Sequence, residues 1–311
     1  MKEKEAPKEL EPYEKAANEI AKENNTDVIL FVGPITRVSA KTLIGICNET
    51  NRRKNVLLIM ETYGGNADAG YQIARCLQDK YENFAIFIRG MCKSSGTLIA
   101  LGANELIMND NGELGPLDVQ MSKKDELWES QSGHIVGTAI DYLQNRAFNS
   151  FADFFRKIIA GDFGNISLKT AANLASELTR GLYGPIFEQV DPMHAGEAGR
   201  ATLIAYHYGT RLVEKSKICE MDVLGQLIYN YPSHGFVIDR DESKDLFKKV
   251  RKPSGNESNL SACLPEFDLS RNLILLLSTS HNDNSMEEKV RKNDTREKSD
   301  EVDNGATEQD S

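Results

Sequence analysis

Two adjacent serines stand at a corner of the chain where an acyl group could be attacked. The stretch "MCKSSGTLIALGA", residues 91–103, places Ser94 and Ser95 between a strand-like run and an apolar, helix-like run. A serine hydroxyl becomes a nucleophile when a base takes its proton, and the oxyanion that forms needs donors, usually two backbone amides. The amide of Ser95, at the start of a helix, is such a donor. The structural alternative is a helix cap made by either serine.

A second strand end carries a matching feature. The stretch "ETYGGNADAG" places Gly64 and Gly65 directly after an apolar strand and just before a helix. Glycine at such a point lets a carbonyl substrate approach the backbone closely, although a glycine pair is also common as a simple turn. The two strand ends together offer one nucleophile and two amides, without any side-chain donor for the oxyanion.

The elements that must position these residues alternate between strand and helix from Asp27 onward. Four near-continuous apolar runs are strand-like, and amphipathic helical patterns separate them: "DVILFVG", "NVLLIMET", "NFAIFIRG" and "NELIMNDNGELGP". Buried strands separated by helices predict an α/β fold with a mainly parallel sheet covered on both faces. The carboxyl ends of neighbouring parallel strands meet at one edge of the sheet. The glycine pair and the serines are therefore expected to lie there together.

The rest of the chain divides into segments that differ in composition and in hydrophobic periodicity. Long helical patterns predict a helical subdomain over about residues 125–230, and "YPSHGFVID" at 231–239 is strand-like again, followed by a helix. The predicted domains are a charged N-terminal arm at 1–26, the main domain at 27–250, an irregular extension at 251–278 and an acidic tail at 279–311. The tail has almost no large apolar residues, so it is predicted to be disordered.

Composition excludes several classes of function. The net charge of −10 argues against nucleic acid as a partner, because phosphate binding needs a basic face. The five cysteines form no CxxC motif and are expected to be free thiols of a cytoplasmic protein. No apolar run is long enough for a transmembrane segment, and the charged N-terminus does not look like a signal peptide. The scattered histidines and the lack of a glycine-rich phosphate loop predict no metal and no cofactor.

The order of these motifs resembles a known superfamily. A strand, a glycine pair, a helix, a strand and then a serine corner that opens an apolar helix are similar to the ClpP/crotonase proteins. Within that superfamily, "SSGTLIALGANELIMNDNGELGPLD", "VDPMHAGEAGRA" and "YPSHGFVID" resemble the serine dehydrogenase proteinase family, which is related to signal peptide peptidase A. The resemblance covers about residues 27–250. It implies a ClpP/crotonase-like spiral of β-β-α units with an added helical subdomain.

The resemblance also implies roles for individual residues. Ser94 matches the nucleophile, Ser95 the amide after it, and Gly65, with Gly64 as the alternative, the other oxyanion amide. It further implies a peptide or protein substrate and a homo-oligomer. The chain departs from ClpP at Gly115, which stands where ClpP has its histidine base.

The general base therefore has to come from elsewhere. His234 lies near the place of the ClpP triad aspartate, and we expect it to be the base. Lys169 is the alternative, because the signal peptide peptidase branch takes a lysine from the helical region, where burial or nearby positive charge must lower its pKa. His194 and Arg200 are predicted to have a structural role rather than to bind a substrate carboxylate.

The predicted function is that of a serine peptidase-like hydrolase that attacks a peptide or other acyl carbonyl. Two alternatives remain. A crotonase-type acyl-CoA enzyme would use the same amides and a carboxylate, for which Glu113 is the only nearby candidate. A non-catalytic scaffold would keep the fold without a working base.

Overall fold

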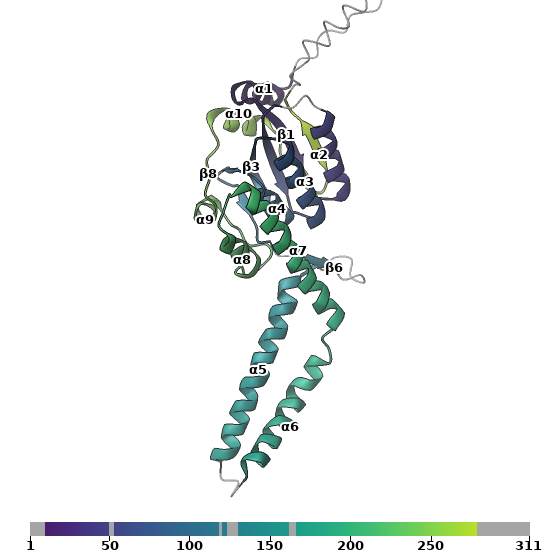
Figure 1. The fold of residues 1–311 in the computed structure, drawn as a ribbon, viewed down its shortest axis with the longest axis vertical. Coiled ribbons are helices and arrows are strands. Elements are labelled where there is room, and N and C mark those ends of the chain that lie inside the picture. The colour runs from purple at the N-terminus through teal and green to yellow at the C-terminus, as the bar shows by residue number, and fades with distance from the viewer. Residues whose placement is uncertain (1–9, 50–52, 118–119, 123–129, 162–165, 279–311) are drawn as a thin grey trace, which may run out of the picture. The chain divides into compact units, whose positions relative to one another are not determined.

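The chain divides into two compact units, which Figure 1 shows in one view of the computed structural model. The structure describes residues 10–49, 53–117, 120–122, 130–161 and 166–278. Within them, the first unit takes the residues up to Leu114 together with 212–219 and those from Asp239 onward. The second unit takes residues 115–211 and 220–238. The predicted tail at 279–311 lies outside the described residues.

A mostly parallel sheet forms the centre of the first unit. Its strands are β1 Thr26–Val32, β2 Asn55–Thr62, β3 Asn83–Cys92, β4 Glu105–Met108, β5 Glu113–Leu114, β8 Val250–Arg251 and β9 Leu273–Leu276. The order across the sheet is β8-β4-β3-β2-β1-β9, with β5 paired to the end of β3, and only β9 among these strands runs antiparallel to its neighbour. The strands consist of apolar runs because both faces of the sheet are covered.

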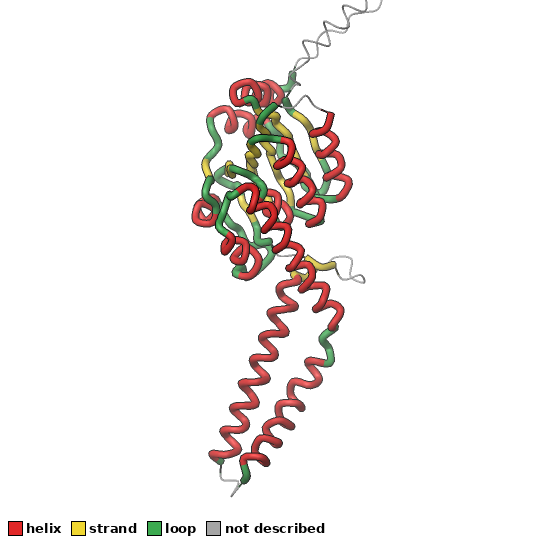
Figure 2. The backbone as a smooth tube through the Cα atoms, in the orientation of Figure 1, coloured by secondary structure: helices red, strands yellow, loops and turns green. Residues whose placement is uncertain are grey.

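Helices cover the two faces of this sheet, as the tube in Figure 2 shows. The helices of the first unit are α1 Pro12–Asn24, α2 Arg37–Glu49, α3 Ala67–Lys80, α4 Ser95–Leu101, α9 Arg240–Leu246 and α10 Gly255–Cys263. Leu57 and Ile59 of β2 belong to one buried cluster with residues of α1 and α10. Thr62 and Cys92 face the other way, where Gly96 of α4 lies directly against their side chains. Successive residues of a strand point to opposite faces, so each strand contributes to both cores.

The segments at both ends of the first unit are more ordered than the sequence indicated. The predicted charged arm contains α1, whose apolar side chains are buried against the sheet. The predicted irregular extension at 251–278 contains α10 and β9. Strand β9 pairs with β1, for example Leu276 with Ile29. These residues are far apart in the sequence, so no local sequence pattern predicted the strand.

The strand-like stretch at 231–239 is not a strand in the structure. These residues form turns and a single bridge, and Pro232 and Gly235 interrupt the run. Proline lacks the amide that a central strand needs, and glycine weakens a strand. The strand that completes this side of the sheet is β8, which pairs with β4.

The second unit is mainly helical. It contains the short hairpin of β6 Gln120–Ser122 and β7 Ser130–Ser132, then α5 Gly133–Ala160, α6 Leu168–Phe187, most of α7 Pro192–Ser216, and α8 Met221–Tyr229. Helices α5 and α6 lie side by side as a long hairpin (Figure 1), and Ser150 of α5 hydrogen-bonds Tyr183 of α6 at 2.9 Å. No helix within the described residues combines the length and the apolar character that crossing a bilayer requires.

Candidate active site

The candidate site lies where β2 and β3 end side by side. The two strands are parallel, and Thr62 is paired with Cys92 at their carboxyl ends. The amide of Lys93 donates a hydrogen bond to the carbonyl of Thr62 at 3.0 Å. The residues that follow each strand, the glycine pair on one side and the two serines on the other, therefore begin next to each other.

Backbone hydrogen bonds hold the glycine turn in place. Gly64 and Gly65 have φ angles of 103° and 144°, which favour glycine over every other residue. The hydroxyl of Thr62 accepts the amide of Gly64 at 2.9 Å, and the amide of Ile35 donates to the Gly64 carbonyl at 2.8 Å. Asn66 closes the turn, because its side chain accepts the Ala69 amide at 2.8 Å and starts α3.

Ser94 has an unusual backbone conformation at the strand-to-helix corner. Its φ is 53° and its ψ is −116°, outside the regions that residues with a side chain normally occupy. Its side chain makes no capping hydrogen bond to α4. The structural alternative considered for this residue, a helix cap, therefore lacks its defining contact. A serine on a strained strand-to-helix turn is the geometry that presents a nucleophilic hydroxyl in other hydrolases.

The glycine turn and Ser94 touch. A Cβ placed on Gly64 would lie 2.8 Å from the Cβ of Ser94 and 3.3 Å from its Oγ. Only a residue without a side chain fits there. The structure thus brings together the four residues that the sequence predicted at the corner: Gly64, Gly65, Ser94 and Ser95.

Two backbone amides at this corner are available. Ser95 is the first residue of α4, where the amide has no partner within the helix. Neither this amide nor that of Gly65 donates a hydrogen bond to any residue that the structure describes. The hydroxyl of Ser95 is buried and likewise has no hydrogen-bond partner among those residues. Ser95 therefore offers a backbone donor, while its side chain is turned into the protein.

A buried ion pair anchors the other side of the corner. The side chain of Lys93 is 8% exposed, and its Nζ donates to the carbonyl of Leu114 at 3.2 Å and pairs with Glu113 Oε1 at 3.2 Å. Because Glu113 and Leu114 form β5, which pairs with Met91 and Cys92, this contact ties β5 to the residue before Ser94. Glu113, the carboxylate considered for crotonase-type chemistry, is thus paired with a lysine.

The thiol of Cys92 does not compete with Ser94 as a nucleophile. Cys92 is fully buried, and burial raises the pKa of its thiol to about 12. A thiol is nucleophilic as the thiolate, so Cys92 is inert at neutral pH.

The candidate bases belong to the second unit. His234 is half-buried in the turns after α8, where the rings of Tyr231 and Phe236 lie 5.1 Å apart. Lys169 is exposed at the start of α6, without the burial that a lysine base needs. Both assignments stay predictions.

Two further residues of that unit were considered from the sequence. Arg200 is exposed on α7, whereas the side chain of His194 lies outside the described residues.

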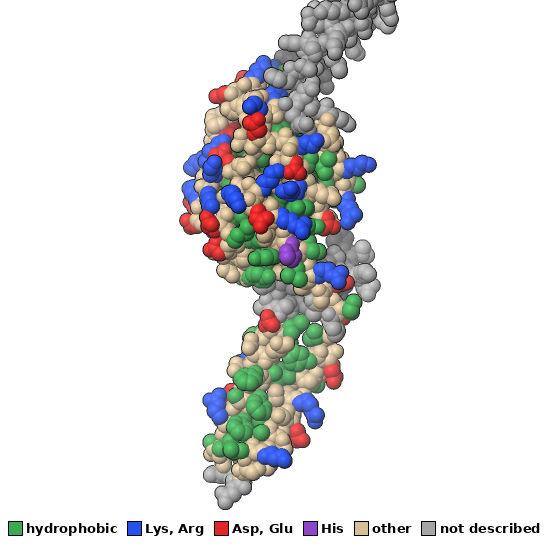
Figure 3. Space-filling view, in the orientation of Figure 1, with side chains coloured by type: hydrophobic (Ala, Val, Ile, Leu, Met, Phe, Trp, Pro, Cys, Tyr) green, Lys and Arg blue, Asp and Glu red, His purple; other side chains and the backbone are tan. Residues whose placement is uncertain are grey.

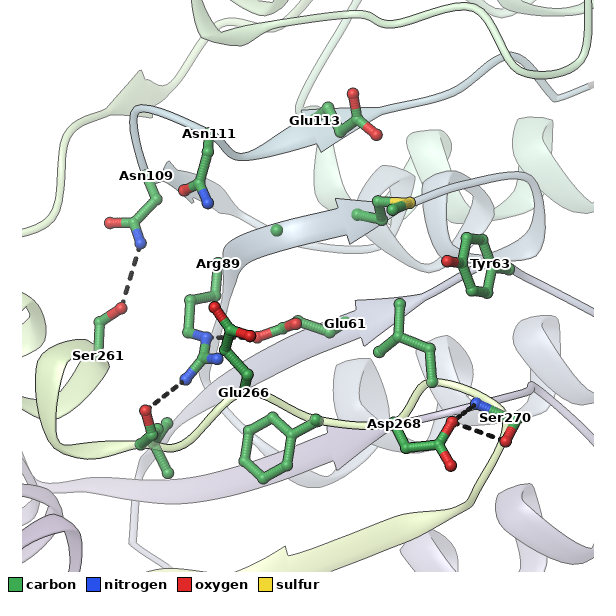
Figure 4. A pocket seen from close by; sticks show the side chains of 15 residues that line it. Glu61, Tyr63, Arg89, Asn109, Asn111, Glu113, Ser261, Glu266, Asp268 and Ser270 are labelled. Carbon is green, nitrogen blue, oxygen red and sulfur yellow. Dashed lines mark hydrogen bonds and ion pairs between the residues drawn. The ribbon is translucent and has the colours of Figure 1, made fainter.

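A pocket that the sequence did not reveal opens beside the corner. It has a volume of about 870 Å³ and is lined by the ends of β2, β3 and β5 and by the segment 261–270 (Figure 4). Tyr63 lies in its wall and directly precedes Gly64. The sequence did contain one sign of this pocket. Polar residues, Glu61 and Tyr63 at the end of β2 and Arg89 in β3, stand where a fully buried strand would have apolar residues.

No group of three or more histidine, cysteine or acidic side chains that could hold a metal ion occurs among the residues that the structure describes. All five cysteines lie in the described ranges, and none of them forms a disulfide there.

Comparison with known proteins places this corner in a family context. Two uncharacterized proteins of Methanocaldococcus jannaschii are similar to the chain. One is 27% identical over 133 residues, or 40% of this chain and 44% of the relative. The other is 33% identical over 89 residues, or 29% and 31%. The matches thus span less than half the length of either relative.

A solved structure is also similar in part. It is an alanine mutant of the 1510-N membrane-bound stomatin-specific protease. The match has a TM-score of 0.31 and 21% sequence identity, and it covers 49% of this chain and 68% of that one.

Residues 15–127 match the family of ClpP-like SDH-type serine proteinases. The matched segment contains the glycine turn, the serine corner and strand β5. Together with the mainly parallel sheet, this match confirms the predicted α/β fold of the ClpP-like type. The resemblance to the serine dehydrogenase proteinase family is therefore confirmed over residues 15–127, the segment that matches the family model.

Proposed function

We propose that this protein is a serine peptidase-like hydrolase that attacks a peptide or other acyl carbonyl through Ser94. The observation that carries the proposal is the strained backbone of Ser94, held against Gly64 without any capping contact. The match of residues 15–127 to a serine proteinase family supports the reaction type.

The proposed reaction begins when Ser94 Oγ attacks the carbonyl carbon and a base takes the hydroxyl proton. The carbonyl oxygen becomes an oxyanion that accepts hydrogen bonds from the amides of Gly65 and Ser95. The intermediate then expels the amine, which leaves with the proton from the base, and an acyl-enzyme remains. Water hydrolyses the acyl-enzyme and restores Ser94. We propose His234 as the base, with Lys169 as the alternative.

The test compares two adjacent alanine variants. Ser94→Ala should abolish labelling of the protein by a fluorophosphonate probe, and peptide hydrolysis should fall by several orders of magnitude while the protein stays folded. Ser95→Ala should keep both activities, because alanine retains the backbone amide and the Ser95 hydroxyl makes no hydrogen bond to a described residue. Labelling that survives in Ser94→Ala would contradict the proposal. A wild-type protein that is never labelled would favour the non-catalytic scaffold.

We also propose a homo-oligomer formed through the α5–α6 hairpin. Hydrophobic side chains gather along this hairpin in Figure 3, and α6 exposes an apolar residue at every fourth position: Leu174, Leu178, Leu182 and Ile186. Two such hairpins can bury these stripes against each other as a four-helix bundle. Light scattering should give a multiple of the chain mass of 34.6 kDa, and Leu178→Glu should reduce it. A wild-type monomer at micromolar concentration would contradict this arrangement.

A further inference from the structure

The pocket beside the corner is connected to the proposed nucleophile on two sides. Tyr63 of the pocket wall directly precedes Gly64, which touches Ser94. Glu113, also in the wall, is paired with Lys93, the residue before Ser94. A peptide held at Ser94 would therefore have a neighbouring side chain within reach of this pocket.

The cationic side chain of the pocket wall is already in use. Arg89 is the only lysine or arginine among the described residues of its wall. Its Nη1 and Nη2 donate to the carbonyls of Leu264 and Pro265 at 3.1 and 2.7 Å, and its Nε pairs with Glu61. The guanidinium carbon also lies 5.1 Å from the centre of the Phe267 ring. Arg89 thus fixes the wall and is not available to bind an anionic ligand.

Two carboxylates of the pocket have few partners among the described residues. Glu61 is 9% exposed, and its one partner among the described residues is Arg89, which meets it through Nε. Glu266 has neither a hydrogen bond nor an ion pair with the described residues. In Figure 4 the Glu61 carboxylate lies at the Arg89 guanidinium, in agreement with their ion pair. The Glu266 carboxylate is therefore a negative charge in the wall that no described cation pairs with.

Carboxylates outnumber the other charged side chains of the wall. Its charged residues are Arg89 and four carboxylates. Glu61 pairs with Arg89, Glu113 with Lys93 and Asp268 with Arg271, so that Glu266 is the carboxylate of the wall without a described cation beside it. A concave surface with one sign of charge concentrates its field on a ligand of the opposite sign. The uncharged part of the wall combines polar residues with four apolar side chains, Met91, Leu264, Phe267 and Leu269.

We propose that this pocket binds a lysine or arginine side chain of the substrate, so that the protein selects peptides with a basic residue near the bond that is cut. The proposal rests on the proposed function of Ser94. The apolar wall would pack against the aliphatic stem of the basic side chain, and Glu61 and Glu266 would accept hydrogen bonds from its charged head. An acidic side chain would meet carboxylates, and the one described cation of the wall, Arg89, is already paired.

Binding is measured on the Ser94→Ala variant of the full chain, so that no peptide is cleaved. Fluorescein-labelled octapeptides carry a single lysine, norleucine or glutamate at one position, and fluorescence anisotropy gives the Kd of each. The lysine peptide should bind at least about fivefold more tightly than the norleucine peptide, the gain typical of a charge-assisted hydrogen bond in a half-open site. The glutamate peptide should bind most weakly. The preference for lysine should shrink as salt is raised.

Matched carboxylate variants locate the effect. Glu266→Gln removes one carboxylate and should reduce the lysine preference to about twofold or less. Glu61→Gln is the second variant and should act in the same direction. Glu82→Gln is the control, because Glu82 is 65% exposed and pairs with Lys54 at the opposite end of the strands. The control should leave the preference unchanged.

Equal affinity for the lysine and norleucine peptides would overturn the proposal, as would a preference that survives unchanged in both Glu266→Gln and Glu61→Gln. Fluorophosphonate labelling of the wild type tests Ser94 separately. Lysine-selective binding without labelling would uphold the pocket and reject the hydrolase. Labelling without lysine selectivity would uphold the hydrolase and reject the proposed ligand of the pocket.

Discussion

The substitution Gly64→Ala tests the contact on which the candidate site depends. The new Cβ would lie 2.8 Å from the Cβ of Ser94 and 2.9 Å from the carbonyl oxygen of Lys93, closer than such atoms approach in proteins. Alanine would also have to adopt a φ of 103°. A strained backbone of this kind costs about 1–3 kcal/mol. Relief of the two short contacts must displace the serine corner, so we expect a total destabilisation of about 2–4 kcal/mol.

A second glycine supplies the matched control. Gly45 lies in α2, and a Cβ added there would meet no atom within 4 Å. Alanine at a helical position of this kind stabilises a protein by about 0.5–1 kcal/mol relative to glycine. Gly64→Ala should therefore lower the melting temperature of the protein, whereas Gly45→Ala should raise it slightly.

The two variants are compared by thermal melting and by the rate of fluorophosphonate labelling. Gly64→Ala should label about 10²-fold more slowly than wild type even well below its melting temperature, because a displacement of about 1 Å at a reacting atom costs that much. Gly45→Ala should label at the wild-type rate. If Gly64→Ala melts and labels like wild type, the turn does not press against Ser94 and the reasoning fails.

Two further predictions concern buried titratable groups. Burial raises the pKa of the Cys92 thiol to about 12. Iodoacetamide at neutral pH should therefore modify the exposed Cys263 of the native protein and leave Cys92 unmodified, which peptide mass spectrometry can measure. Modification of both cysteines at equal rates would contradict the burial of Cys92. Burial alone would raise the pKa of Glu257, but hydrogen bonds from Arg251 at 2.6 and 2.8 Å outweigh it and hold the pKa below its ordinary value. The stability that Glu257 contributes is therefore present above about pH 4.3 and is lost as the pH falls through the lowered pKa, so Glu257→Gln should melt earlier at pH 7 and lose less on acidification. An unchanged melting curve at both pH values would refute this.

The serine corner was predictable because its causes are local in sequence. Apolar runs identified the strands, and the two motifs each follow such a run directly, at 64–65 and 94–95. Parallel neighbouring strands bring their carboxyl ends to one edge, so adjacency of the motifs followed from the fold class alone. The backbone strain of Ser94 was not predictable, because φ and ψ at a corner depend on how the helix packs after the turn.

The C-terminal part of the first unit shows where sequence reasoning failed and where it had an unused signal. Strand β9 pairs with β1, and only that distant partner makes "LILL" a strand rather than a short apolar run. Helix α10, by contrast, begins with a capping box between Ser254 and Glu257, which is a local pattern. The pocket wall could not be predicted either, because its residues are far apart in the sequence: Glu61 and Arg89 come from the sheet and Glu266 from the segment after α10.

The backbone of Ser94 carries the strongest argument for a function at this corner. Three described residues other than glycine have a positive φ: Asn25, Ser94 and Lys217. Asn25 is the C-cap of α1 in the left-handed helical region, and Lys217 directly follows the end of α7, positions where a positive φ satisfies the last carbonyls of a helix. Ser94 instead stands before a helix, with a ψ of −116° that lies outside the left-handed region. A glycine would relieve this strain, and the chain does place glycines at 64 and 65, where the neighbouring turn requires them. Ser94 is the one strained position without a structural explanation, and it keeps a hydroxyl in contact with Gly64. This is expected if the hydroxyl itself has a function at the corner.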